Sequence, residues 1–144
     1  MCNKSLELIV YYINDTKLSY EELKRSLNTV TGYIQVVFNK DENEMNIVTL
    51  KTNIQSKGYG SFLLYYAMVN AMSKNIEKVV LDDVSDRYRD SSNIYTKYGL
   101  KYKQDDCPEM EGFVAEILEK FSTISFKTKL LTKTFSMEVF PIDC

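Results

Sequence analysis

Two closely spaced glycines, between an apolar segment and a stretch with helical spacing, carry the clearest chemical signal in the chain. The segment reads Gln55-Ser56-Lys57-Gly58-Tyr59-Gly60-Ser61. Glycines let successive backbone N–H groups turn toward one point, and a helix that begins there adds the positive end of its dipole. Lys57 adds a positive charge nearby. This loop is therefore expected to bind an anion such as a pyrophosphate.

Two common phosphate-binding loops do not fit the segment. A Walker A loop requires GxxxxGK followed by Ser or Thr, whereas Gly58 is followed by Tyr59 and Gly60. A GxGxxG dinucleotide-binding fingerprint would need a glycine where the chain has Leu63, which disfavours a nucleotide-binding α/β domain. Taken alone, the two glycines leave a tight turn without a ligand as the alternative.

The absence of histidine restricts the catalytic groups available to the chain. With no histidine in 144 residues, Ser-His-Asp and Cys-His catalysis and most zinc sites are excluded. The three cysteines, Cys2, Cys107 and Cys144, lack CxxC spacing and are typical of reduced thiols in the cytoplasm. No metal site is expected, and catalysis must come from Tyr, Asp, Glu, Lys, Cys or backbone groups.

A second motif follows further along the chain, and it reads Asn93-Ile94-Tyr95-Thr96-Lys97-Tyr98-Gly99-Leu100. Together with Gln55-x-x-Gly58-x-Gly60, it resembles the [Q/R]-x-x-G-x-[G/A] loop and the [L/I]-Y-x-K-x-G-F segment of the GNAT superfamily, the acetyl-CoA-dependent N-acetyltransferases. The resemblance extends over about residues 5–105, with the same order of elements. The chain departs from the family pattern at Leu100, where an aromatic residue is usual, and at Tyr88 and Ser91.

The resemblance implies an enzyme that moves an acetyl group from acetyl-CoA to an unidentified primary amine by direct attack in a ternary complex. Backbone groups of the strand that includes Val48 and Leu50 would bind the pantetheine. The loop would hold the pyrophosphate, through Gln55, Ser56, Lys57, Gly58, Tyr59, Gly60 and Ser61. Tyr95 matches the position from which a tyrosine hydroxyl protonates the departing thiolate. A catalytically silent CoA-binding or protein-interaction module on the same fold is the alternative.

The base that takes a proton from the incoming amine is less well defined. Asp82 and Asp83 end a short strand, and only one of them can face the site because successive strand side chains point to opposite faces. The sequence favours Asp83 as the base. Glu44, Asn46 and a water relay are the alternatives.

The surrounding pattern predicts the elements that position these residues. Strands are expected at 6–13, 32–38, 45–50, 78–83, 100–103 and 135–139, and helices at 19–27, 61–74, 91–98 and 113–121. Ser19, with Glu22 three residues later, is typical of a capping box. The helix at 61–74 is apolar on every side, so it should be largely buried.

The expected fold class is α/β (mixed α+β, GNAT-like), in a single domain over residues 1–144. A central twisted, mostly antiparallel sheet would contain a splayed parallel pair and carry helices on both faces. Hydrophobic residues at 44% and charged residues at 26% are typical of a globular domain with a core.

Net charge and hydropathy limit the partners. A net charge of −2 argues against a nucleic-acid binder that relies on a broad basic surface. No apolar run is long enough to span a bilayer, and the first residues lack a signal-peptide pattern. A cytoplasmic enzyme that binds neither nucleic acid nor membrane is therefore expected, and a homodimer is left open.

Overall fold

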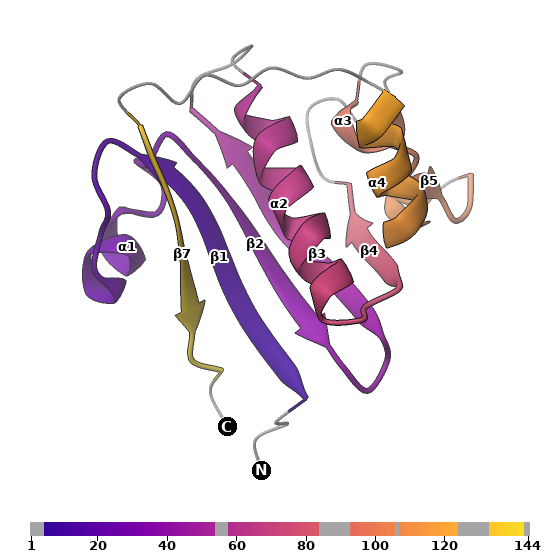
Figure 1. Ribbon diagram of the computed structural model, residues 1–144, viewed down its shortest axis with the longest axis horizontal. Coiled ribbons are helices and arrows are strands. Elements are labelled where there is room, and N and C mark those ends of the chain that lie inside the picture. The colour runs from indigo at the N-terminus through magenta and orange to yellow at the C-terminus, as the bar shows by residue number, and fades with distance from the viewer. Residues whose placement is uncertain (1–4, 54–57, 84–92, 106, 124–132, 143–144) are drawn as a thin grey trace.

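The computed structural model describes residues 5–53, 58–83, 93–105, 107–123 and 133–142 (Figure 1). Its elements are, in chain order, β1 (Leu6–Asn14), α1 (Tyr20–Ser26), β2 (Gly32–Asn39), β3 (Glu44–Thr52), α2 (Tyr59–Ser73), β4 (Lys78–Asp82), α3 (Ile94–Lys97), β5 (Lys101–Tyr102), β6 (Glu109–Phe113), α4 (Val114–Thr123) and β7 (Thr134–Phe140). None of the described helices is long and apolar enough to cross a membrane.

The described strands form one seven-stranded sheet in the order β5-β6-β4-β3-β2-β1-β7. Only β3 and β4 pair in parallel, and all the other neighbours in this sheet are antiparallel. The mixed α+β class, the mostly antiparallel sheet and its one parallel pair are confirmed.

The two faces of the sheet carry different helices. On β1, Ile9 and Tyr11 belong to the main core, which α2, α3 and α4 cover. Val10 and Tyr12 point to the opposite face and pack with Leu23 of α1 in a smaller core. The capping box at the start of α1 is present, with Glu22 N donating to Ser19 Oγ and Ser19 N donating to Glu22 Oε1. Helices on both faces are confirmed.

A β-bulge interrupts the pairing of β3 with β2. Val36 pairs with Ile47, and the preceding residue, Gln35, pairs with Thr49, so Val48 is an extra residue on β3. A bulge of this kind bends the strand and increases its local twist.

The bulge also changes which residues of β3 point toward the core. Met45 and Ile47 are buried in the main core before the bulge, and Leu50 packs against the same core after it. Side chains of an unbroken strand alternate, so residues 47 and 50 would otherwise point to opposite faces. The extra residue keeps both apolar segments of β3 on the core side.

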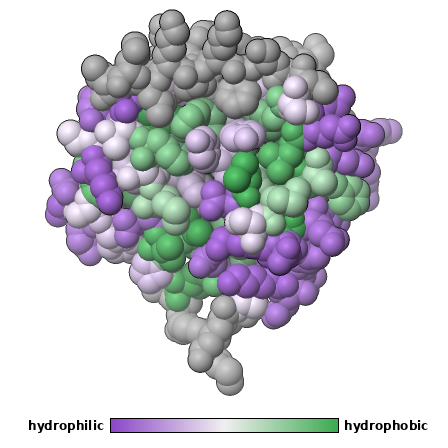
Figure 2. Space-filling model, viewed as in Figure 1, coloured by the Kyte–Doolittle hydropathy of each residue, from purple (hydrophilic) through white to green (hydrophobic). Residues whose placement is uncertain are grey.

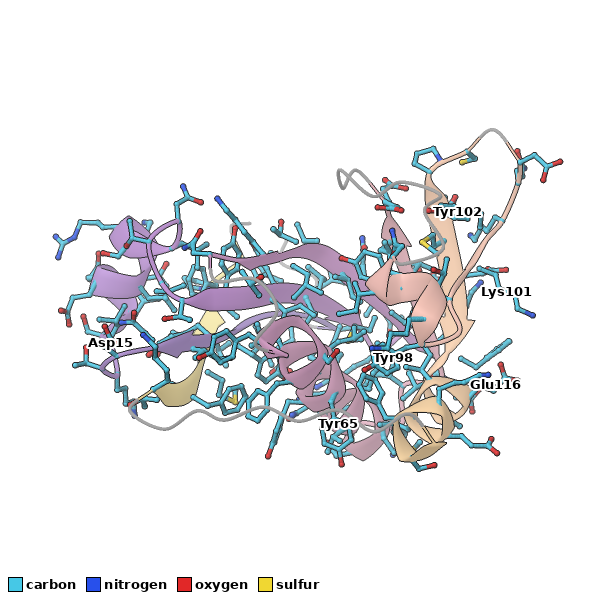
Figure 3. All side chains as sticks on the ribbon, turned by 90° about the horizontal axis from the view of Figure 1, so that it is seen from above. Asp15, Tyr65, Tyr98, Lys101, Tyr102 and Glu116 are labelled. Carbon is cyan, nitrogen blue, oxygen red and sulfur yellow. The ribbon has the colours of Figure 1, made fainter. Side chains whose placement is uncertain are left out.

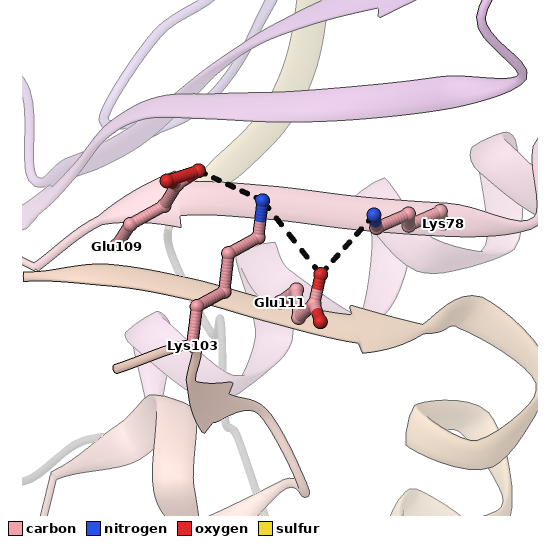
Figure 4. A network of polar contacts seen from close by, with 4 residues as sticks. All are labelled: Lys78, Lys103, Glu109 and Glu111. Carbon is pink, nitrogen blue, oxygen red and sulfur yellow. Dashed lines mark hydrogen bonds and ion pairs between the residues drawn. The ribbon is translucent and has the colours of Figure 1, made fainter. Parts of the chain in front are cut away.

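The strand β6 follows Pro108, although no strand is expected between residues 103 and 135. β6 lies between β4 and β5, and Met110 is its fully buried residue. Its two glutamates meet lysines of the neighbouring chain segments: Lys78 Nζ lies 3.1 Å from Glu111 Oε2, and Lys103 Nζ lies 2.8 Å from Glu109 Oε1 (Figure 4). The acidic residues therefore pair across strands and do not cap a helix.

The expectation that the apolar helix α2 is largely buried is only half right. One side of α2 is buried in the main core, including Leu64 and Met68. The other side leaves Tyr66, Val69 and Met72 exposed, at 36%, 36% and 44% of their surface. Of these three residues, Tyr66 still contacts Phe135 of β7, so the exposed apolar surface of α2 is partial.

Candidate active site

β3 and β4 separate at the bulge. Their parallel pairing runs from Glu44 with Lys78 to Ile47 with Leu81, and Ile47 immediately precedes the extra residue, Val48. β3 continues to Thr52 without β4 beside it. The backbone of β3 from Val48 onward therefore has no β4 partner on that side, as the expected splayed pair requires.

The first turn of α2 lies just beyond the end of β3. Gly58 is the N-cap, with a φ of 77° that favours glycine, and no described side chain caps the helix. The first bond of the helix runs from Phe62 N to Gly58 O, at 3.0 Å. The N–H groups of Tyr59, Gly60 and Ser61 precede it and have no acceptor within the helix. Such a turn is suited to an anion.

The short helix α3 packs against this first turn. A Cβ at Gly60 would lie 3.2 Å from Ile94 Cδ1, so the glycine permits a close approach of the two helices. The Tyr98 hydroxyl donates to Ser61 Oγ at 3.0 Å, and the Tyr98 ring stacks on the Phe121 ring of α4 with centroids 3.8 Å apart. Figure 3 labels Tyr98 among the side chains of this part of the molecule. These contacts fix α3 relative to the start of α2.

A buried polar cluster joins the end of β4 to α3. Asn93 Nδ2 donates to Asp83 Oδ2 at 2.8 Å, and the Tyr102 hydroxyl donates to the same oxygen at 2.5 Å. Asn93 Oδ1 accepts the backbone N–H of Tyr95 at 2.7 Å and so caps α3. Asp83 and Asn93 each expose only 2% of their surface. Hydrogen bonds are required here because burying an unpaired carboxylate is costly.

Tyr95 is 8% exposed and lies close to this carboxylate. Burial, and in second place the negative charge of Asp83, raise the pKa of the Tyr95 hydroxyl well above its ordinary value. The hydroxyl therefore stays protonated throughout the neutral range and can act as a hydrogen-bond donor.

The structure brings most of the described candidate residues to one end of the β3–β4 pair. Val48 is 50% exposed at the bulge, and Leu50 follows it, partly buried against the core. Asp83 follows β4 two residues after the last pair with β3. The other described candidates belong to α2 and α3: Gly58, Tyr59, Gly60, Ser61 and Tyr95. Gln55, Ser56 and Lys57 lie outside the described residues.

The alternative bases on β3 come before the bulge at Val48, and so before the point where β3 and β4 separate. Glu44 begins the parallel ladder, four residues before Val48, which corresponds to roughly 13 Å along a strand. Asn46 is exposed two residues before the bulge. Asp82 is exposed and Asp83 is buried, so the two carboxylates point to opposite sides as expected.

Three residues with polar contacts around the candidate site were not predicted from the sequence: Asn93, Tyr98 and Tyr102. Asn93 stands two positions before Tyr95, where an Asn can accept the N–H of that residue as an N-cap. This signal is present in the sequence. The bonds from the two tyrosine hydroxyls join residues 37 and 19 positions apart, and no local pattern indicates them.

Among the described residues, no group of three Cys, Asp or Glu side chains could hold a metal ion.

Solved structures share this architecture. No protein-family model matches the chain, and no curated protein matches it. Gcn5 of Tetrahymena is 17% identical with a TM-score of 0.51, over 78% of this chain and 70% of Gcn5. A mutant of the AtaT toxin, bound to the C-terminus of the antitoxin AtaR, is 13% identical with a TM-score of 0.51, over 83% of this chain and 99% of the toxin. The fold is that of the GNAT acetyltransferases.

Proposed function

We propose that the chain is an N-acetyltransferase that transfers the acetyl group of acetyl-CoA to a primary amine, by direct attack within a ternary complex. The observation that carries the proposal is the coincidence of three features: the bulge at Val48, the end of the β3–β4 pairing, and the start of α2. In this fold they create a stretch of β3 that β4 does not accompany, close to a helix N-terminus. Gly58 and Gly60 of the first motif and Ile94 and Tyr95 of the second belong to the two helix starts that meet there.

The residues present fit acetyl-CoA in two respects. The N–H groups of Tyr59, Gly60 and Ser61 suit the negative charge of a pyrophosphate. The backbone of β3 around Val48 and Leu50 offers donors and acceptors for the amides of a pantetheine chain, as an added strand would use them. Gln55, Ser56 and Lys57 would complete the loop.

Acetyl-CoA supplies a thioester, whose acyl carbon accepts the lone pair of the amine while the electron pair of the C–S bond leaves with sulfur. Tyr95 would donate its hydroxyl proton to that sulfur as the negative charge develops. The hydroxyl is protonated at neutral pH, as a tyrosine at its ordinary pKa of 10.0 would also be, so the support for this role is the match of Tyr95 to the second motif. Solvent would then return a proton to the Tyr95 oxygen.

The geometry favours a positioning role for Asp83 over the role of base. Its Oδ2 already accepts bonds from Asn93 and Tyr102, and the residue is 2% exposed. Through Asn93 the carboxylate is connected to the backbone N–H of Tyr95, the first turn of α3. Asp83 would therefore fix the orientation of Tyr95, and water would carry the proton away from the amine.

The proposal includes a cytoplasmic location, which the three cysteines without CxxC spacing support. It includes no metal ion. The expected effect of EDTA on turnover is therefore none, and restoration of a lost activity by zinc or magnesium would contradict the mechanism.

The first test is calorimetric titration of the full chain with acetyl-CoA and with CoA, followed by an amine panel that detects released CoA. Binding of acetyl-CoA with turnover of at least one amine is expected. Absence of binding would overturn the proposal. Binding without turnover over the whole panel would support the silent CoA-binding module on the same fold.

The second test removes the Tyr95 hydroxyl and keeps its ring. Tyr95→Phe should lower kcat at least about tenfold and change acetyl-CoA affinity less than about threefold, because the interaction strengthens only in the transition state. Tyr11→Phe is the matched control, since it removes another buried tyrosine hydroxyl far along the chain from the site. Equal effects of the two substitutions would exclude a specific role for Tyr95.

A further inference from the structure

The two edges of the sheet are built differently. At one edge β5 has two residues, Lys101 and Tyr102, and Lys103 follows directly. At the other edge β7 has seven residues, Thr134–Phe140, and contains no lysine, arginine or proline. Short edge strands and edge lysines prevent pairing with another chain, whereas a long apolar edge invites it. Lys133 and Pro141 flank β7, but its seven paired residues carry none of these protections.

The side chains of β7 support the same distinction. Phe135, Met137 and Val139 pair with β1 residues of the main core, so they lie on the face that α2 covers. Phe135 packs against Phe62 and Tyr66 of α2, with ring centroids 5.1 and 4.8 Å apart. Farther along β7, Met137 and Val139 remain 43% and 49% exposed. Apolar side chains gather on this face of the molecule (Figure 2).

We propose that β7 pairs antiparallel with β7 of a second copy of the chain, about a twofold axis at Met137, and joins the two sheets edge to edge. One side of β7 is bound to β1 from Phe140 to Thr134. Within the described residues, no strand lies on its outer side. A twofold axis satisfies both copies with one strand, as an isologous interface requires.

The sequence of β7 is self-complementary in this register. Phe135 would face Val139 of the second copy, and Met137 would face its own counterpart, which joins the apolar positions on the α2 side. On the other side of the sheet, Glu138 would face Ser136 of the second copy. Cross-strand apolar pairs stabilise a sheet and directly opposed like charges destabilise it.

Neighbouring registers fit less well. An axis at Glu138 would place two carboxylates directly opposite each other. An axis at Ser136 would keep Phe135 opposite Met137 but would place Val139 opposite Lys133 of the second copy, so Val139 would lose its apolar partner in both copies. The register centred on Met137 is therefore the one that the side chains specify, and a second copy is the occupant that suits this edge.

The test is the mass of the full chain in solution, by light scattering or sedimentation, from micromolar to submillimolar concentration. The wild-type chain should reach twice the mass of one copy, and Met137→Lys should weaken the association at least about tenfold because lysine protects an edge strand. Phe113→Lys is the matched control: it places the same charge on β6, at a residue that is 55% exposed, and should leave the dimer intact.

Hydrogen exchange on the wild-type chain gives an independent measurement. Amides of β7 should be protected in the concentrated sample and lose that protection on dilution, while amides of β2 should not change. A single-copy mass at all concentrations would overturn the proposal, including the case in which a strand of another protein occupies the edge. A dimer equally weakened by both lysine substitutions, or an open-ended assembly, would also overturn it. Neither outcome depends on acetyl-CoA, so the proposed function is tested separately.

Discussion

The sheet has two parts that differ in construction, one on each side of β3. In the long-strand part, β1, β2 and β7 have nine, eight and seven residues and pair antiparallel. In the short-strand part, β4, β6 and β5 have five, five and two residues and join β3 through the single parallel pairing. The short-strand part also contains the buried polar residues Asp83 and Asn93. These two buried polar residues thus lie beside the short strands, and the longest antiparallel ladders lie on the other side of β3.

The largest effect should come from the core of the long-strand part. Ile34 of β2 is fully buried, and Ile34→Ala should lower the free energy of unfolding by about 2–5 kcal/mol because it leaves a cavity. Ile34→Val, the matched control, should lower it by about 0.5–1.5 kcal/mol. Denaturant unfolding measures both. A small loss for Ile34→Ala would mean that the long-strand part does not dominate stability.

A second substitution tests the polar cluster of the short-strand part. Asp83→Ala removes the acceptor for Asn93 and Tyr102, and the free energy of unfolding should fall by about 1–3 kcal/mol. Asp83→Asn keeps one acceptor oxygen, so it should lose less. Chemical unfolding of the purified variants provides the comparison.

The same cluster separates two roles for Asp83. If Asp83 positions Tyr95 through Asn93, then Asn93→Ala and Asp83→Asn should lower kcat by similar factors. If Asp83 is the base, Asp83→Asn should abolish turnover while Asn93→Ala leaves most of it. Steady-state rates with the best amine of the panel decide between them.

Two buried tyrosines, one in each part, sharpen the comparison at alkaline pH. Burial is the main cause that raises the pKa of both Tyr11 and Tyr95, and the nearby carboxylates Glu7 and Asp83 raise it further. Below pH 10 both hydroxyls are protonated in the folded and the unfolded chain. Above pH 10 the unfolded tyrosines ionise first, so the free energy of unfolding should fall by up to about 1.4 kcal/mol per pH unit for each group.

Replacement by phenylalanine should therefore reduce this alkaline loss for either tyrosine. Only Tyr95→Phe should also reduce turnover. Urea unfolding between neutral pH and pH 11, together with the amine assay, tests both expectations. A Tyr11→Phe variant with reduced turnover would show that the two parts are not functionally distinct.

The smallest effect should come from the exposed ion pairs of Figure 4. Lys103→Ala removes the contacts to Glu109 and Glu111, which are partly solvent-exposed, and should change thermal stability less than any substitution above.

The hydrogen bond from Lys78 is the main cause that lowers the pKa of Glu111 below its ordinary 4.5. That contribution is present above pH 4.5 and should disappear as the pH falls further. Thermal melts at neutral and acidic pH measure it.

Local signals allowed much of the fold to be predicted. The capping box of Ser19 and Glu22 depends on residues three positions apart, and it is present as expected. The strand β6 was missed because Glu109 and Glu111 resemble the acidic start of a helix. Their partners, Lys78 and Lys103, become neighbours only when the sheet forms.

The site was predictable as far as its two motifs reach. Gly58 and Tyr95 carry signals within their own segments. The bond between Tyr98 and Ser61 depends on how α3 packs against α2, which no local pattern encodes. The bond between Tyr102 and Asp83 depends in the same way on the fold, which brings β5 to the end of β4.

The bulge at Val48 makes the length of β3 as important as its composition. Val48 is the one extra residue that β3 has relative to β2 at the bulge, and its side chain is half-exposed. The side chain at this position can therefore vary freely. Deletion of Val48 would instead remove the bulge and restore regular pairing with β2. Leu50 would then turn from the core toward water. Relatives of this chain should therefore accept many residues at this position and almost no gap there. An alignment that places a deletion at this point would have misaligned the strand.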